Sequence, residues 1–408
     1  MRSGAPTTST ASQTTSIVAP PSSGASHCWE KSILKNAIAT TGRTEITPLK
    51  ANGQTPLGLS LYTPEALIHQ LTAGPFSSRH LIDGLLAELT TRAKDTGQRK
   101  TPWLYWKISH QLLDSAEVME LMYFIGKQFQ LGDSNSSHYS VCFTPEQLDP
   151  QRAALFKGLG YNCLELELAA SIAASEPQLT EQLTLAGSLC QDYHYPHFAL
   201  RMNEYNPSLT TAVNRLQQAQ RRLPDSIHIA SCQFPSPLDF QGMFYGLRDL
   251  GYRVLGNDCF VRPGTALANA QINNHLKLSS EGYNCQNVVD IVGLGPGNRS
   301  TLNHTHYQNP SLLPQYLANP LGERFMTPSP ATRLKLVIDN LLCYHQLDFK
   351  YFEDRYDLPL EQIITRAWGP LANSPYAHLN KKQLRLTAKG VLELTSLCQS
   401  LIDHFCTI

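Results

Sequence analysis

The sequence predicts an α/β fold built around parallel strands. From residue 57 onward, short apolar runs alternate six times with amphipathic helical patterns. This alternation is typical of parallel sheets whose strands are joined by right-handed helical crossovers. Near residue 328 the rhythm gives way to a mostly helical pattern. At 408 residues, the chain is long enough for one large domain and an appendage.

Each of the six units begins with a strand-like apolar run and continues with a helical pattern. The predicted strands are 57–62, 103–108, 139–143, 163–168, 198–202 and 227–232. The predicted helices that follow them are 80–93, 115–129, 150–159, 178–193, 209–222 and 240–250. The pattern predicts a parallel sheet, with closure into a barrel left open.

Residues 251–300 carry more turn and glycine signals than the rest of the chain. A short β-like run at 252–258 ends in turn formers, and 265–271 has the alanine-rich composition of a short helix. Residues 288–294 predict a buried strand that runs into the glycines of 293–297. Glycines there would let backbone approach backbone or a bound ligand.

The last segment predicts a separate, mostly helical appendage. Helices are expected at 331–344 and 360–368, then a short strand at 383–387 and a final helix at 388–405. This order is winged-helix-like. We therefore divide the chain into a disordered tail at 1–26, a lead-in at 27–56, the barrel at 57–250, its extension at 251–328 and the appendage at 329–408.

Composition argues against several classes of function. Basic and acidic residues number 33 each, which predicts neither nucleic-acid nor polybasic membrane binding. No apolar run approaches the ~20 residues of a membrane span, and the beginning lacks a signal-peptide layout. The ten cysteines include no C-x-x-C pair, so we expect buried, reduced thiols in a cytoplasmic protein.

The order of motifs in 251–300 resembles the oxygen-independent coproporphyrinogen III oxidases, a family of radical SAM proteins. In that family a Gly-Tyr strand precedes Asp-His-Phe-Ala-x-Pro, an Ala-rich helix ending in Gln, a Gln-Gly-Tyr turn and a Gly-x-Gly segment ending in Ser. The matching residues here are Gly251, Tyr252, Asp258, Phe260, Pro263, Gln271, Gly282, Tyr283, Gly293, Gly295 and Ser300. The resemblance implies a partial (βα)6 barrel with a winged-helix-like C-terminal appendage.

The same resemblance implies cofactor motifs that this sequence lacks. The family holds a [4Fe–4S] cluster, and with it S-adenosylmethionine, through C-x-x-x-C-x-x-C after the first strand. Here residues 63–69 follow Tyr62, and no cysteine lies between Cys28 and Cys142. The glycine-rich turn, the third-strand Glu and the Gly-Val-Gln are replaced too, by residues 105–110, Cys142 and residues 167–170. We therefore expect no cofactor and no metal site in this chain.

Family position nominates four ligand-binding residues: Tyr62, Cys142, Glu281 and Arg299. Arg299 could bind a propionate group bidentately, or pair with Glu281 or lie at the surface. The expected ligand is accordingly porphyrin or haem, and the expected partner another haem-pathway protein.

Other candidates keep two interpretations each. The histidines of 194–197 and of 304–306 are either metal or haem ligands or members of solvated loops. The aromatic residues Trp103, Tyr105 and Trp106 are either core or a binding platform.

Three functions are compatible with these observations. The first is a coproporphyrinogen III oxidase-like protein of haem biosynthesis that binds porphyrin or haem as an accessory protein, without radical SAM catalysis. The second is an active coproporphyrinogen III dehydrogenase. The third is a non-enzymatic interaction partner.

Overall fold

A computed structural model gives the fold of most of the chain. It describes residues 55–64, 67–68, 71, 75–96, 99–109, 111–133, 136–168, 175–203, 205–229, 236–279, 281–303, 305–321, 323–326, 329–368 and 374–405. The predicted tail and nearly all of the predicted lead-in lie outside these residues.

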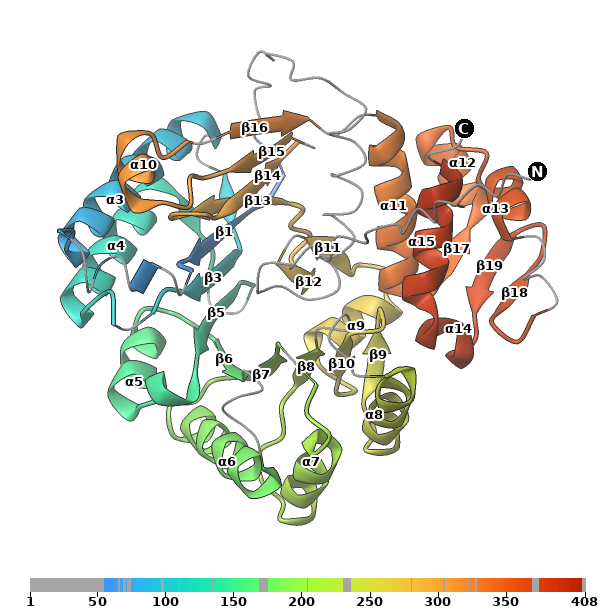
Figure 1. Cartoon of the computed structure of the whole chain (residues 1–408), viewed down its shortest axis with the longest axis horizontal. Helices are drawn as coiled ribbons and strands as arrows, with labels where there is room; N and C mark the ends of the chain where they lie inside the picture. The colour runs from blue at the N-terminus through green and yellow to red at the C-terminus, as the bar shows by residue number, and fades with distance from the viewer. Residues whose placement is uncertain are drawn as a thin grey trace, which may run out of the picture.

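The core of the molecule is one curved sheet whose central strands run parallel (Figure 1). Each strand after the first pairs in parallel register with the preceding one, and β13 returns to pair with β1. The parallel strands, in spatial order, are β13 (Asp290–Leu294), β1 (Leu57–Tyr62), β3 (Trp103–Lys107), β5 (His138–Phe143), β6 (Cys163–Leu168), β7 (His197–Met202) and β8 (Ser226–Ile229). The minor strands β2 (Lys100–Thr101) and β4 (Gln130–Leu131) form a separate parallel pair.

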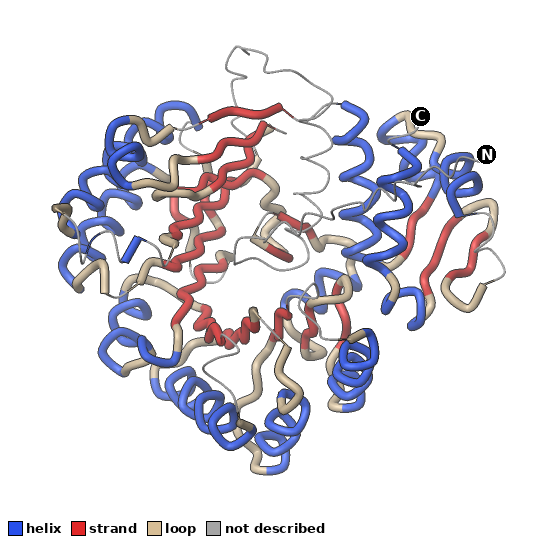
Figure 2. The backbone as a smooth tube through the Cα atoms, viewed as in Figure 1, coloured by secondary structure: helices blue, strands red, loops and turns tan. Residues whose placement is uncertain are grey.

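Helices cover the convex side of this sheet, as Figure 2 shows by colour. They are α3 (Ser78–Thr96), α4 (Ser115–Gln128), α5 (Pro150–Gly158), α6 (Glu176–Asp192), α7 (Leu209–Gln218) and α8 (Pro237–Asp249). Local chemistry fixes where α4 begins: Asp114 accepts from the Glu117 N–H while the Glu117 carboxylate accepts from the Asp114 N–H. Such a capping box satisfies two backbone donors that the first turn leaves free.

Strand alternation divides the aromatic cluster between the two faces of the sheet. Trp106 packs on the convex side, with its ring centroid 5.4 Å from that of Phe156. Trp103 and Tyr105 lie on the concave side and stack at 5.9 Å. All three rings are buried, so the core interpretation holds for each, and Trp103 and Tyr105 belong to a small core cluster inside the barrel.

Antiparallel strands extend the sheet at both edges. On one side lie β10 (Cys259–Val261) and β9 (Arg253–Leu255), and on the other β14 (Arg299–Leu302), β15 (Thr305–Gln308) and β16 (Glu323–Met326). The helices α9 (Ala266–Ile272) and α10 (Leu313–Ala318) accompany these segments. A small hairpin, β11 (Lys277–Ser279) with β12 (Gly282–Asn284), lies on the concave side.

The C-terminal part combines helices with a three-stranded sheet. Its elements are α11 (Ser329–Tyr344), β17 (Gln346–Asp348), α12 (Phe349–Tyr356), α13 (Leu360–Trp368), β18 (Ala377–Leu379), β19 (Gln383–Leu386), α14 (Ala388–Leu392) and α15 (Leu394–Phe405). The long helix α11 contacts β11 and β9 and so joins this part to the barrel extension. Among the described residues, no helix has the length and apolar composition to cross a bilayer.

The predicted α/β class and the C-terminal appendage are confirmed. The final predicted helix is divided at Glu393 into α14 and α15, and β13 adds a seventh parallel strand to the six expected. The strands β10, β11, β12, β14, β15, β16, β17 and β18 had not been predicted.

Candidate functional site

The retained motif residues have identifiable structural roles. Tyr252 donates its hydroxyl to the Pro224 carbonyl at 2.8 Å, and Gln271 donates to the Cys343 carbonyl at 3.0 Å. Ser300 accepts the Gly293 N–H at 2.9 Å. The motif therefore marks contacts that hold the barrel extension together.

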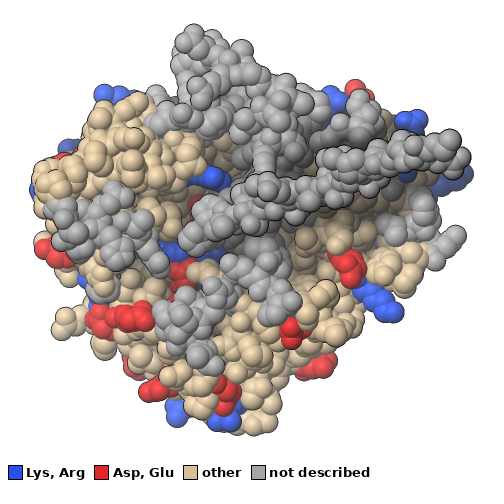
Figure 3. Space-filling view, in the orientation of Figure 1, with Lys and Arg blue, Asp and Glu red and all other residues tan. Residues whose placement is uncertain are grey.

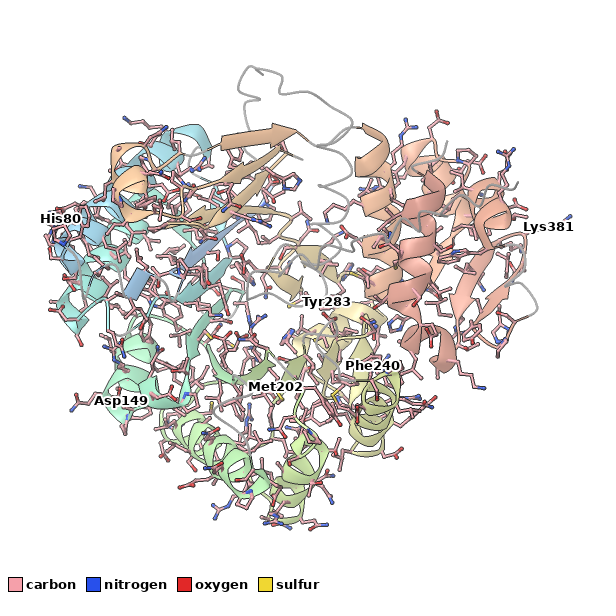
Figure 4. The ribbon with its side chains drawn as sticks, viewed as in Figure 1. His80, Asp149, Met202, Phe240, Tyr283 and Lys381 are labelled. Carbon is pink, nitrogen blue, oxygen red and sulfur yellow. The ribbon has the colours of Figure 1, made fainter. Side chains whose placement is uncertain are left out.

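The other motif residues lie in the same region. Phe260 is fully buried in β10, and Tyr283 is buried in β12 near the centre of the view in Figure 4. Asp258 is buried just before β10, Pro263 is exposed just after it, and Gly251 and Gly282 have positive φ.

Gly295 allows β13 to pass close to β1. Its φ is +110°, and a Cβ there would lie 2.7 Å from the Tyr62 carbonyl oxygen. Its N–H donates to Glu88 at 2.9 Å, and Glu88 also accepts from Tyr316 and Asn309. Burial raises the pKa of Glu88, although these hydrogen bonds oppose the rise. The glycine segment is thus anchored to α3.

At the carboxyl ends of the strands, a buried ion pair lies across the barrel. Lys107 Nζ is 2.5 Å from Glu167 Oε1, and Asn203 donates to the same oxygen at 2.7 Å. Burial lowers the pKa of Lys107, but the Glu167 charge more than offsets this and raises it. Burial likewise raises the pKa of Glu167, and Lys107 reverses the shift so that it is lowered. Both groups are therefore ionised at neutral pH.

The ion pair brings together two of the four nominated residues. The Lys107 ammonium lies 5.4 Å from the Tyr62 ring centroid, a cation–π geometry. Cys142 Sγ is 3.7 Å from Glu167 Oε2. Burial raises the pKa of the Cys142 thiol well above its usual value. The thiol is therefore neutral at neutral pH.

A second buried pair lies deeper in the barrel. Arg201 donates to Glu165 through Nε and Nη2, at 2.7 and 3.3 Å, and Tyr105 donates to Glu165 at 2.7 Å. Burial would raise the pKa of Glu165, but Arg201 lowers it to about 2. Two cations and two carboxylates thus balance inside the barrel.

These charged residues were not among the predicted site residues, although the sequence carries a signal for them. In 163–168 the sequence Cys-Leu-Glu-Leu-Glu-Leu alternates leucine with cysteine or glutamate. Such alternation places the leucines on one face of the strand and the carboxylates on the other. A parallel strand with two carboxylates on one face predicts buried cationic partners.

Glu281 and Arg299 lie on different elements. Glu281 directly precedes β12 and is half-buried. Arg299 lies on β14, where its Nε donates to Gln308 Oε1 on β15. The Arg299 guanidinium therefore contacts Gln308, whereas the sequence had suggested Glu281 as its partner.

The nominated histidines have different positions. His194 follows α6 with a φ of 56°, and His197 is the first residue of β7. His306 lies on β15 rather than in a loop, 3.0 Å from Thr301 Oγ1. His304 lies outside the described residues.

The residues at the end of β1 do not fit a three-thiolate cluster. Thr63 and Pro64 follow the strand, and the sequence has no cysteine between Cys28 and Cys142. Among the residues that the structure describes, no three His, Cys, Asp or Glu side chains form a group suited to a metal ion. The chemistry at this end of β1 is that of the Lys107–Glu167 pair.

Comparisons with known proteins support the resemblance. No family model matches the chain. An oxygen-independent coproporphyrinogen III oxidase from Escherichia coli is 29% identical over 216 residues, which are 48% of this chain and 46% of that protein. Its counterpart from Pseudomonas aeruginosa is 23% identical over 330 residues, which are 72% and 71% of the two chains. This chain thus spans about half the length of the Escherichia coli relative.

A solved structure shows the same fold. It is coproporphyrinogen III oxidase from Escherichia coli, described as a radical SAM enzyme; the TM-score is 0.72 at 20% identity, covering 86% of this chain and 91% of that one. The fold is therefore that of a radical-SAM-like α/β barrel. Within that class, the chain is a homologue of the oxygen-independent coproporphyrinogen III oxidases.

One prediction is wrong. We expected no cofactor, but the solved structure that shares this fold is a radical SAM enzyme, a class defined by S-adenosylmethionine and iron–sulfur chemistry. The prediction extended the loss of the cluster loop and of three neighbouring motifs to the whole chain. Ligands need not be adjacent in sequence, and Cys28, Cys232 and Cys406 lie outside the described residues.

Proposed function

We propose that this chain acts in haem biosynthesis, in the cytoplasm, as a coproporphyrinogen III oxidase-like accessory protein that binds a propionate-bearing tetrapyrrole. Its homologues are named oxygen-independent coproporphyrinogen III oxidases. The substrate in that name carries propionate side chains, so a ligand of this kind requires cationic hydrogen-bond donors beside a surface wide enough for a macrocycle.

The observation that supports tetrapyrrole binding most directly is a set of polar side chains on one face of β14 and β15. Ile291, inside the barrel, pairs with Thr301, which pairs in turn with His306. Arg299 and Gln308 are also directly paired. Because directly opposite residues in antiparallel strands share a face, all four polar residues continue the concave face. Each is half-buried, so each has surface left for a ligand.

This face has suitable donors for a carboxylate. The Arg299 guanidinium has five N–H donors, of which the Gln308 contact uses the one at Nε. The remaining donors can bind a propionate in the forked geometry that arginine favours. His306 provides an imidazole on the same face, which would suit either a second propionate or haem iron.

An absorbance titration tests the binding proposal. Coproporphyrin III and haem should each shift their Soret band on addition of the full chain. Arg299→Gln should weaken coproporphyrin binding about tenfold or more, the effect of losing a charged hydrogen bond. Arg253→Gln is the matched control, because Arg253 is an exposed arginine on β9.

Each other result has a defined meaning. A Soret shift equal in both variants would place the ligand elsewhere. An unshifted spectrum with both ligands would reject tetrapyrrole binding and favour the third function, an interaction partner.

The second candidate function is an active coproporphyrinogen III dehydrogenase. The similarity to named oxidases and to the fold of a radical SAM enzyme favours it. The residues at the end of β1 favour the accessory role. Anaerobic assay of the purified chain with S-adenosylmethionine and coproporphyrinogen III, monitored as release of carbon dioxide, separates the two. Sustained release would establish the enzyme and reject the accessory role.

A further inference from the structure

One hollow in the described part of the chain lies at the amino ends of the parallel strands. The first residues of five neighbouring strands line it: Trp103, His138, Cys163, His197 and Ser226. It contains about 700 Å³ of space, including the part open to solvent. Barrel enzymes bind their substrates at the carboxyl ends of the strands, so this hollow lies away from the usual substrate position. We call it the amino-end hollow.

One wall of the amino-end hollow is aromatic. Trp103 and Tyr105 stack with their ring centroids 5.9 Å apart and their planes 21° from parallel. They belong to a small buried cluster with Val288 and Ile291. An aromatic wall of this kind favours a flat ring over a flexible chain.

Neighbouring strands of the same sheet provide imidazole nitrogens. His138, His197 and His228 come from β5, β7 and β8. The His138 and His197 rings lie 5.6 Å apart, and His138 Nε2 is already 2.9 Å from Ser140 Oγ. His197 and His228 are half-buried and retain accessible surface. A neutral imidazole offers one donor and one acceptor, so these histidines suit a ligand with both.

The buried charged groups Glu165, Arg201 and Asp225 of the amino-end hollow are already paired. At its base Arg201 and Glu165 form a two-point contact. At its side Asp225 accepts from Arg222 at 2.6 Å and from the Phe198 N–H at 2.9 Å. Glu281 stands at the edge, half-buried. A ligand that brought its own charge would lose hydration without a free counter-charge in the interior.

We propose that the amino-end hollow is a second ligand site that binds an uncharged, planar nitrogen heterocycle of about nucleobase size. The ring would stack on the Trp103–Tyr105 wall and exchange hydrogen bonds with His197 and His228. Tetrapyrrole binding at the β14–β15 face neither requires nor excludes this site.

Calorimetry on the full chain at pH 7.5 tests the ligand class. Adenine is the probe; benzoate and benzamidine are planar comparators of similar size that carry one negative and one positive charge. We expect adenine to bind at least about tenfold more tightly than either, because the charged rings must be desolvated without a partner. Equal affinity for the three, or no binding of adenine at millimolar concentration, would overturn the proposal.

Imidazole ¹⁵N shifts in chain labelled at histidine test the location without any substitution. Adenine should move the signals of His197 and His228 and leave that of His80, an exposed residue on α3. His197→Ala should weaken adenine binding about tenfold, the effect of one buried hydrogen bond, whereas His80→Ala should not change it. Unmoved His197 and His228 signals in the presence of bound adenine would place the ligand elsewhere and reject the site.

Discussion

Charged residues inside the barrel are stabilised mainly by a partner of opposite charge. Glu165 and Arg201 are both buried or nearly so, and each neutralises the other. Removing one partner of a buried pair leaves an uncompensated charge, whereas replacing both by groups of similar shape often costs little.

We therefore expect Arg201→Met to lower the free energy of unfolding by about 3–5 kcal/mol. The double variant Arg201→Met with Glu165→Gln should recover much of this loss, because no buried charge remains. Urea unfolding followed by circular dichroism measures both. Strictly additive losses from the two substitutions would show that the pair is not coupled.

At Gly295 the addition of a single methyl group is expected to lower the stability of the fold. Gly295→Ala places a methyl group 2.7 Å from the Tyr62 carbonyl oxygen on a backbone of φ +110°. Strain of this kind costs about 1–3 kcal/mol before the contact with Tyr62 is included.

The matched control is Gly158→Ala at the end of α5, where an added methyl meets nothing within 4 Å. We expect it to be neutral or stabilising, because alanine favours a helix. Thermal unfolding of both variants tests the comparison. Equal melting temperatures would contradict the role assigned to Gly295.

At the scale of elements, local patterns predicted strands and helices well. Strand 57–62, strand 163–168 and helix 360–368 match β1, β6 and α13 in full. Strands of three or four residues, such as β10 and β14, were missed because so short a run carries little periodicity.

Pairing between distant elements was harder to predict. β13 lies beside β1 although more than 200 residues separate them, and no local signal encodes that pairing. The charged residues inside the barrel show the same limit. Glu165 could be found from strand alternation. Its partner Arg201 becomes evident only when β6 and β7 are known to be neighbours. Of the nominated residues, Tyr62 and Cys142 lie near one ion pair, and their roles in binding stay predictions.

Three histidines on β5, β7 and β8 should make the stability of the fold depend on pH. Burial and the neighbouring His197 lower the pKa of His138 to about 3, and burial with Arg201 lowers that of His228 to about 4. Burial also lowers the pKa of His197. In an unfolded chain these groups titrate near pH 6.5, so the unfolded state binds more protons between roughly pH 6.5 and 4.

Linkage then fixes the sign: stability is highest above pH 6.5 and falls as the pH drops toward 4. His228→Phe, which cannot be protonated, should show a shallower fall over that window. His378→Phe is the control, because His378 is an exposed histidine on β18. Urea midpoints measured from pH 7.5 to 4.5 give both slopes. Identical slopes for His228→Phe and the unsubstituted chain would contradict this assignment.

On the scale of the whole molecule, charge is spread rather than concentrated. Equal numbers of basic and acidic residues are present, and Figure 3 shows both signs interspersed on the face it presents. Association by long-range attraction to a polyanion is therefore not expected. Cohesion between the barrel and the C-terminal part depends instead on specific contacts.

Each of those contacts involves a backbone carbonyl group. The Gly256 N–H donates to the Leu342 carbonyl at 2.8 Å, His345 Nε2 lies 2.7 Å from the Gly256 carbonyl, and Gln271 donates to the Cys343 carbonyl. Tyr344 adds a hydroxyl bond to the Leu276 carbonyl at 2.7 Å. The end of α11 is thus attached to the retained motif region at four points, which should make the two parts unfold together.

Tryptophan fluorescence can test this coupling because Trp106 reports on the barrel and Trp368 on the C-terminal part, and both are buried. In single-tryptophan variants, the two probes should give the same urea midpoint, as a cooperative transition requires. Introducing Gln271→Ala removes the side-chain bond to the end of α11 and should move both midpoints together. Separate midpoints in the parent variants would show that the four bonds do not couple the two parts, and that the C-terminal part unfolds as an independent domain.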